Sequence, residues 1–308
     1  MDWNCYEENL KNSLVNWFSE IEEIQNKQYD DENLLFELNK NTIDSFSAIV
    51  DVFSSKSTFD KWLENEKTRQ KQKSLQGKIG DLHEIMIITL SDTIQKKQKD
   101  NEGYTIFDLY DETNKWIAEV KNKHNTTKGD DRSNSFDKLN ECLKMNCYSC
   151  FTAYYVTILR DKRAFINEEF KPSDNTKKNK MYNPKIIHID GESFYTKITG
   201  EEDALEKAYL TLSKLLQERF EFEEDEYSRK MVKTLKDFSL YKFKVNINKP
   251  SKVTLMSLNG IGEGMANAII EYHKKEAFEK KEDLMKVHGI GKRKYEQFKN
   301  FITTDNIE

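Results

Sequence analysis

The chain has 308 residues, a mass of 36.4 kDa and a formal net charge of −5 at pH 7, which is enough length to bury a core without disulfides or structural metals. Its mean hydropathy of −0.84 and the lack of any apolar run of about eighteen residues exclude a membrane-spanning protein, and the acidic N-terminus lacks the order of a signal peptide, so we expect a cytoplasmic location. The overall charge does not decide whether the protein binds nucleic acid. A pI near 5.8 argues against a protein that coats nucleic acid but allows a local basic cleft.

Residues 1–100 predict a helical region, because apolar residues recur at spacings of three and four and no proline interrupts them. The longest helix should begin near Ser57-Thr58, which can cap its N-terminus, and continue to Ile88. Gly77 and Gly80 inside this helix suggest a break or a close approach to another backbone.

The pattern changes to strands at about Tyr104. Residues 105–110 are apolar and β-prone, residues 111–114 form a turn, and residues 115–121 alternate with period two, so we predict a β-hairpin. A helix with apolar positions at 136, 139 and 143, strands at 151–159 and 186–189, and a helix over 204–220 follow. Strands mixed with helices predict an α/β domain.

The hairpin contains a candidate catalytic set. Glu119 and Lys121 are two positions apart on one strand, so both side chains leave the same face, and Asp108 on the paired strand can lie beside them. Two carboxylates with a lysine suit phosphodiester hydrolysis, in which Asp108, Glu119 and the carbonyl of Val120 would hold Mg²⁺ and the lysine would orient or deprotonate water. The alternative interpretation is a solvated edge of alternating charges.

Polar residues directly after this strand can donate to phosphates and base edges. They are Asn122, Lys123, Asn125, Thr126, Thr127 and Lys128. With Glu119-Val120-Lys121, this stretch resembles the GGNCC-cutting type II restriction endonucleases of the PD-(D/E)XK superfamily. Other phrases in the same order extend the resemblance over residues 40–216, among them Tyr154-Tyr155-Val156 and Asp190-Gly191-x-Ser193-Phe194-Tyr195.

The resemblance implies a PD-(D/E)XK nuclease-like mixed sheet flanked by helices, and a sequence-specific endonuclease that cuts double-stranded DNA. Asp108, Glu119 and Lys121 would be its catalytic residues, with Mg²⁺ as cofactor. Glu84 would be a possible accessory residue that acts through a metal-bound water, although a charged surface position is the simpler interpretation. We also expect a host methyltransferase that protects the target, and a homodimer.

The C-terminal part repeats one short phrase, Leu258-Asn259-Gly260-Ile261-Gly262 and Val287-His288-Gly289-Ile290-Gly291. Each copy stands between helical patterns and resembles a helix-hairpin-helix motif, in which Gly260, Gly262, Gly289 and Gly291 would let backbone NH groups approach phosphate. Residues 251–302 hold ten basic and seven acidic residues. A protein-docking module is the alternative.

We therefore expect an N-terminal helical region with the nuclease domain over 1–220, a helical connector over 221–250 and a tandem helix-hairpin-helix unit over 251–308. The alternatives to a restriction enzyme are a repair or junction nuclease and a non-catalytic DNA-binding protein. Cys142, Cys147 and Cys150 could also form part of a zinc site, although no second Cys or His pair completes a tetrahedron.

Overall fold

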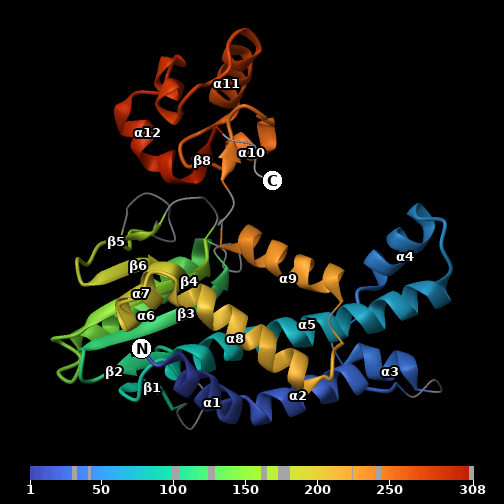
Figure 1. Cartoon of the computed structure of the whole chain (residues 1–308). Coiled ribbons are helices and arrows are strands. Elements are labelled where there is room, and N and C mark those ends of the chain that lie inside the picture. The colour runs from blue at the N-terminus through green and yellow to red at the C-terminus, as the bar shows by residue number, and fades with distance from the viewer. Residues whose placement is uncertain are drawn as a thin grey trace. The chain divides into compact units, whose positions relative to one another are not determined.

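The computed structural model describes residues 1–29, 33–40, 43–98, 105–123, 129–160, 165–172, 181–223, 225–240 and 244–304. They form two compact units, one made of Asp2–Thr89 and the other of Met1 with Leu90–Glu308. Figure 1 shows the order of the elements along the chain. None of the helices in the described ranges combines the length and the apolar character needed to cross a bilayer.

The Asp2–Thr89 unit is helical, as the apolar spacing predicted. Its helices are α1 (Trp3–Ser13), α2 (Val15–Asn26), α3 (Leu34–Asn39), α4 (Ser45–Ser54) and α5 (Phe59–Ile88). Thr58 caps α5 by accepting a hydrogen bond from Lys61 N at 3.2 Å, so the predicted start is confirmed. Tyr6 of α1 and Trp17 of α2 donate side-chain hydrogen bonds to backbone carbonyls of α5.

The predicted break in the long helix is wrong. Helix α5 continues without interruption through Gly77 and Gly80, and a Cβ atom at either position would meet nothing within 4 Å. No other backbone therefore approaches these glycines closely within the described residues. Each glycine lowers the stability of the helix by roughly 1 kcal/mol relative to alanine. Helix α5 tolerates this modest cost.

The Leu90–Glu308 part contains a six-stranded mixed sheet with the order β1-β2-β3-β4-β6-β5. Its strands are β1 (Ile94–Lys96), β2 (Leu109–Asp111), β3 (Trp116–Lys123), β4 (Thr152–Leu159), β5 (Asn167–Glu169) and β6 (Ile186–Asp190). The predicted hairpin is confirmed as the antiparallel pair β2–β3. However, β2 has three residues instead of the predicted strand over 105–110, and Asp108 directly precedes it.

Helices cover both faces of this sheet, so the predicted α/β class is confirmed. On one face, α6 (Gly129–Lys144) places Phe136 and Leu139 in a buried cluster with Ile117 and Tyr155. On the other face, α7 (Gly191–Thr199) packs Phe194 against Trp116 and Tyr154, with ring centroids 5.5 and 5.7 Å apart. Helices α8 (Ala204–Arg219) and α9 (Glu226–Ser239) follow α7.

The turn from β6 into α7 depends on a buried carboxylate and a glycine. Asp190 caps α7 by accepting from Ser193 N at 3.0 Å, and its side chain pairs with Arg160 at 3.4 Å. Gly191 lies so close to β4 that a Cβ atom there would stand 2.6 Å from the carbonyl oxygen of Ile158. The Asp190-Gly191 phrase therefore serves the fold.

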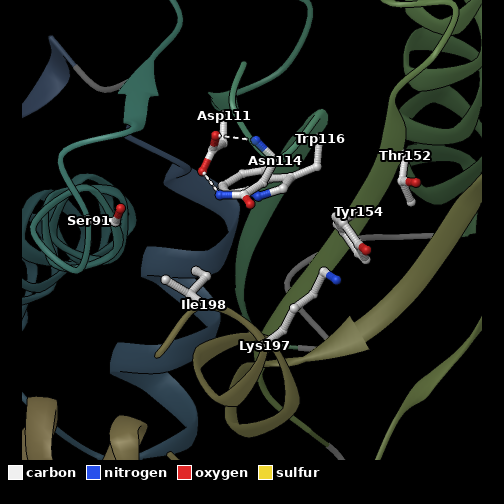
Figure 2. Close-up of a pocket in the computed structure, with 8 residues that line it drawn as sticks. All are labelled: Ser91, Asp111, Asn114, Trp116, Thr152, Tyr154, Lys197 and Ile198. Atoms are coloured by element: carbon white, nitrogen blue, oxygen red, sulfur yellow. Dashed lines mark hydrogen bonds between the residues drawn. The ribbon is translucent and has the colours of Figure 1, made fainter. Parts of the chain in front are cut away.

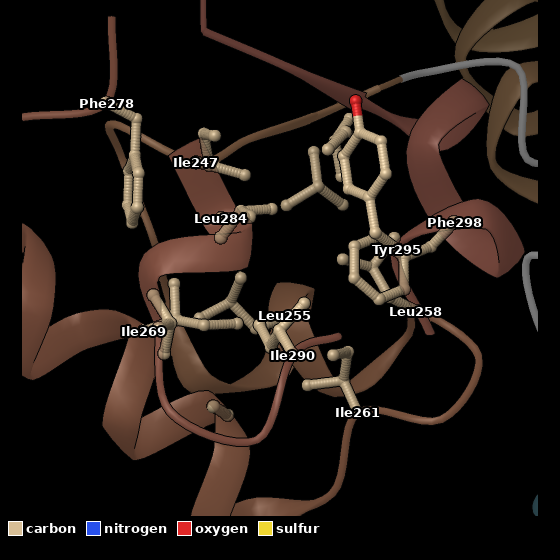
Figure 3. Close-up of a cluster of buried hydrophobic side chains, with 14 residues drawn as sticks. Ile247, Leu255, Leu258, Ile261, Ile269, Phe278, Leu284, Ile290, Tyr295 and Phe298 are labelled. Atoms are coloured by element: carbon tan, nitrogen blue, oxygen red, sulfur yellow. The ribbon is translucent and has the colours of Figure 1, made fainter. Parts of the chain in front are cut away.

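The C-terminal tail is a small helical unit with its own core, shown in Figure 3. Its elements are β7 (Val245–Asn246), α10 (Lys252–Met256), α11 (Glu263–Lys275), η1 (Lys281–Lys286), α12 (Lys292–Phe298), η2 (Lys299–Phe301) and β8 (Ile302–Thr303). The parallel pair β7–β8 joins its two ends. Leu258, Ile261, Val287 and Ile290, the apolar residues of the repeated phrase, are all buried.

Both copies of the phrase form the same turn. Ile261 N bonds to the Leu258 carbonyl at 3.2 Å and Ile290 N to the Val287 carbonyl at 3.1 Å. Gly260 and Gly289 occupy the third turn position with φ of 76° and 89°, as a type II turn requires. The first copy has Asn259 in the second position, where proline is common, and makes the turn equally well.

We expect Gly191→Ala and Gly80→Ala to change stability in opposite directions. The Cβ atom of Gly191→Ala would collide with the β4 backbone and reduce the free energy of unfolding by roughly 1–3 kcal/mol. Gly80→Ala adds a methyl group in open space on α5 and should raise it by about 0.5–1 kcal/mol. Urea denaturation measures both, and equal effects would contradict the close packing at Gly191.

Candidate active site

Strand β3 changes from apolar to charged along one face. Because side chains alternate along a strand, Ile117, Glu119 and Lys121 leave the same face, and Ile117 belongs to the core beneath α6. Glu119 and Lys121 continue that face toward the end of the strand. They lie opposite Tyr155 and Thr157 of β4, the parallel neighbour of β3. The core therefore supports the charged pair from one side.

Glu119 and Lys121 form a partly buried ion pair. Lys121 Nζ donates to Glu119 Oε1 at 2.5 Å, with 27% of the lysine side chain and 11% of the glutamate side chain exposed. Burial acts to lower the pKa of Lys121, but the carboxylates of Glu119 and Asp108 outweigh it, so this pKa is raised above its ordinary value. The lysine is therefore an ammonium ion at neutral pH.

Asp108 joins this pair from the neighbouring strand. Leu109 lies opposite Ala118 in the β2–β3 register, and continuing that register by one residue puts Asp108 opposite Glu119. Asp108 Oδ2 accepts a hydrogen bond from Val120 N at 2.7 Å. The three residues predicted as catalytic are thus brought together.

The carboxylates of Asp108 and Glu119 supply oxygen atoms at this point, and the role of the Val120 carbonyl as a third metal ligand stays a prediction. Within the described ranges, no three Asp, Glu, His or Cys side chains are grouped closely enough to hold a metal. The three clustered cysteines therefore form no such group: Cys142 is buried, while Cys147 and Cys150 are exposed. Burial raises the pKa of the Cys142 thiol to about 11, which disfavours the thiolate that zinc needs.

Arg132 of α6 is a second cation near this face that the sequence did not single out. Its guanidinium carbon lies 5.9 Å from the ring centre of Tyr155 and 5.5 Å from that of Phe170, and these two rings stack 4.4 Å apart. Arg132 Nε is buried and makes no hydrogen bond to a residue that the structure describes. Lys121 and Arg132 thus both lie around Tyr155, which also interacts electrostatically with Lys121.

A cavity of about 240 Å³ lies on the opposite side of the sheet (Figure 2). Trp116 and Tyr154 line it, and their positions on β3 and β4 alternate with those of Glu119 and Tyr155, so their side chains leave the other face. Asp111 at its rim accepts hydrogen bonds from Asn114 N and Nδ2, both at 2.8 Å, and stabilises the hairpin turn. The candidate catalytic residues lie outside this cavity.

The other predicted residues divide into three groups. Asn122 is half-buried and Lys123 is exposed at the end of β3, while Asn125, Thr126, Thr127 and Lys128 lie outside the described residues. Glu84 lies half-buried on α5 and belongs to the Asp2–Thr89 unit, so its accessory role stays a prediction. Of the four predicted glycines of the tail, Gly260 and Gly289 form the two turns described above, and Gly262 and Gly291 precede helices.

Gly262 and Gly291 begin helices α11 and α12 in extended conformations, with φ of −94° and −85°. Neither contributes a side-chain cap, and a Cβ atom at either position would meet nothing within 4 Å. A side chain introduced at either position would therefore point into open space. Helix N-termini of this kind are suited to bind anions.

Residues 7–221 match the Eco47II restriction endonuclease family, and residues 241–303 match the helix-hairpin-helix motif. The first match covers well over half of the chain. The chain belongs to the Eco47II restriction endonuclease family. The predicted class, a sequence-specific type II restriction endonuclease, is therefore confirmed, and so is the predicted helix-hairpin-helix tail.

Named relatives agree with this family. The type II restriction enzyme Eco47II of Escherichia coli is 33% identical over 177 residues, 56% of this chain and 71% of that enzyme. The type II restriction enzyme Sau96I of Staphylococcus aureus is 31% identical over 178 residues, 54% of this chain and 63% of that enzyme, slightly less than two thirds of its length.

A third relative matches a shorter stretch of the chain. ComE operon protein 1 of Bacillus subtilis (strain 168) is 40% identical over 60 residues, 19% of this chain and 29% of that protein. Together, the matches favour a restriction enzyme over the repair nuclease and the non-catalytic DNA-binding protein.

Proposed function

We propose that Asp108, Glu119 and Lys121 are the catalytic residues of this restriction endonuclease and hydrolyse duplex DNA with Mg²⁺ at GGNCC. The observation that carries the proposal is the hydrogen bond from Val120 N to Asp108 Oδ2 at 2.7 Å. It holds one carboxylate beside the strand that carries the other carboxylate and the lysine. Tight placement of this kind is what a reaction controlled by positioning and charge needs.

The oxygen donors fit Mg²⁺ better than a softer metal. Magnesium keeps several waters and takes one or two protein carboxylates, and Asp108, Glu119 and the Val120 carbonyl would hold it. When bound, the ion would stabilise negative charge on the scissile phosphate. The lack of a group of three acidic, His or Cys side chains within the described ranges is compatible with so small a ligand set.

We propose that Lys121 acts as a hydrogen-bond donor in this arrangement. Its Nζ donates to Glu119 Oε1 at 2.5 Å, and an ammonium carries three N–H donors. The proposal keeps both roles expected from the sequence, orienting the attacking water and deprotonating it. The ammonium also adds positive charge where a phosphate oxygen would lie.

We expect Asp108→Asn, Glu119→Gln and Lys121→Ala each to reduce plasmid cleavage by on the order of a hundredfold or more, because each variant removes a metal ligand or the positioned charge. Asp108→Asn keeps an oxygen that can accept from Val120 N, so the hairpin should survive. Cleavage is measured with purified proteins in Mg²⁺ and after chelation, which should abolish it.

The matched control for these variants is Glu112→Gln. Glu112 is an exposed carboxylate in the turn of the same hairpin, and its replacement should leave the cleavage rate unchanged. A Glu119→Gln enzyme that cut at the wild-type rate with an unchanged melting temperature would remove this site from consideration.

We propose GGNCC as the target, because the phrases of the catalytic region resemble enzymes that cut it and the family match covers residues 7–221. The host would then need a methyltransferase that protects the same sequence. We expect the ends of digested plasmid fragments to map to GGNCC, and DNA premodified at that sequence to resist cleavage. Ends at an unrelated sequence would overturn the target and leave the catalytic proposal intact.

The tail, in our proposal, holds DNA phosphates through the NH groups at the starts of α11 and α12. This contribution would be independent of sequence and sensitive to salt, because it works by displacing counterions. Sequence recognition would then lie in the nuclease domain. We propose the domain division over 1–220, 221–250 and 251–308 on the same separation of roles; strand β7, within the connector range, pairs with β8 of the tail.

We expect truncation after Leu240 to weaken binding to all duplexes alike and to flatten the dependence of affinity on salt, while the same sequence is still cut at low salt. A Gly262→Val and Gly291→Val double variant should have the same effect, because side chains there would cover the NH groups without a clash. Fluorescence anisotropy at several salt concentrations measures both.

Val253→Thr, an exchange at an exposed position of α10, is the control for the glycine variant and should keep the wild-type salt slope. An unchanged slope in the truncated protein would make the tail a protein-docking module. A changed target would contradict the separation of roles.

The enzyme is proposed to act as a homodimer. One chain supplies one catalytic hairpin, and cutting both strands of a duplex requires two hydrolysis events on backbones of opposite direction. GGNCC has two-fold symmetry apart from its centre, and a two-fold dimer matches it. Two copies would place one site on each strand.

A further inference from the structure

Helix α4 (Ser45–Ser54) has apolar residues on two opposite faces. Ala48 and Val52 are buried, with 6% and 4% of their surface exposed, on the face where α4 packs against α5. At 3.6 residues per turn, four further apolar residues fall outside this buried face, three of them toward the opposite side and Ile49 on the flank. They are Phe46, Ile49, Val50 and Phe53, which are 82%, 47%, 66% and 70% exposed. A helix that only covers a core has polar residues there.

The apolar surface continues onto the first residue of α5. The rings of Phe53 and Phe59 meet edge to face with centroids 6.3 Å apart, and Phe59 is 49% exposed. We call Phe46, Ile49, Val50, Phe53 and Phe59 the α4 patch. All five belong to the Asp2–Thr89 unit, whereas the hairpin with Asp108, Glu119 and Lys121 belongs to the other unit.

The size of the α4 patch matches one side of a stable protein interface. With about 150–250 Å² for each fully exposed aromatic side chain, its exposed apolar area is roughly 500–600 Å². A standard interface covers about 800 Å² on each partner, of which about 56–65% is apolar. The patch alone therefore supplies the apolar share of such an interface, and it reaches the upper end of what monomeric proteins expose.

The order of residues in the patch identifies the occupant. Phe46-x-x-Ile49-Val50-x-x-Phe53 has an aromatic residue at each end and branched aliphatic residues in the middle, so its types read alike in both directions. If two such helices pack antiparallel about a two-fold axis between Ile49 and Val50, each Phe46 meets Phe53 of the other helix. A pattern complementary to its own reverse is what an isologous interface needs.

We infer that the α4 patch is the interface of a symmetric homodimer, in which α4 packs antiparallel against α4 of a second copy of this chain. The proposed function includes a homodimer, and this inference names the surface through which the two copies associate. It rests on the proposed function only in assuming that there are two copies. Val50 of one chain then contacts the central residues of the other, including the second Val50.

The position of Val50 near the axis allows a charge-exchange experiment. Val50→Asp and Val50→Lys each place two like charges in contact, so either variant alone should associate on the order of a hundredfold more weakly than wild type. An equimolar mixture of the two should form a dimer again, because every contact then pairs opposite charges. Sedimentation velocity and light scattering measure the mass against the 36.4 kDa chain.

Val15→Asp is the matched control. Val15 is 58% exposed on α2 of the same unit, and its variant should remain dimeric. Circular dichroism and melting temperature report whether each variant is folded. Recovery in the mixture, which a misfolded chain could not give, supports the interface directly.

Two results would overturn the inference. A wild-type chain that stays monomeric at micromolar concentration would assign the patch to another partner, and a Val50→Asp protein that stays dimeric would place the interface elsewhere. Neither readout involves cleavage. A Glu119→Gln protein should dimerise like wild type, so failure of the catalytic proposal and failure of this interface are distinguishable.

Discussion

The arrangement of the site depends on one hydrogen bond, from Val120 N to Asp108 Oδ2 at 2.7 Å. A backbone donor in a partly buried sheet requires an acceptor, and here the acceptor is a carboxylate. That requirement fixes a charged side chain beside Glu119, where repulsion would otherwise separate the two acids. The ammonium of Lys121, 2.5 Å from Glu119 Oε1, offsets part of the same repulsion. The sheet thus provides a close pair of carboxylates without a flexible loop.

Features encoded by neighbouring residues could be predicted from the sequence. The alternation before Lys121 gives β3 and the shared face of its two charged residues, since side chains on a strand repeat every two positions. Thr58 identifies the start of α5, because its hydroxyl can satisfy an open NH group only at a helix N-terminus. Gly260 and Gly289 identify the two turns, because glycine readily adopts positive φ.

Features that depend on distant residues could not be predicted. Arg132 follows Lys121 by eleven positions, and only the packing of α6 on the sheet brings it to Tyr155. Strand β2 begins after Asp108, whose side chain accepts from Val120 N. The glycines of α5 were expected to break the helix or to touch another backbone, but they lie in open surroundings. The sequence alone does not reveal such surroundings. From the sequence, the apolar residues on the exposed side of α4 would be assigned to the core. The structure shows instead that Ala48 and Val52 are the buried residues of this helix.

The phrases that carry the family resemblance differ in what they do. Asp190-Gly191 caps α7 and allows close packing on β4, and Tyr155 belongs to the buried cluster beneath α6. Such phrases preserve a fold. Among these phrases, Glu119-x-Lys121 is the one that the proposed function assigns to the reaction. In the proposed function, recognition of a particular DNA sequence would belong to other residues of the nuclease domain, such as the polar residues that follow β3.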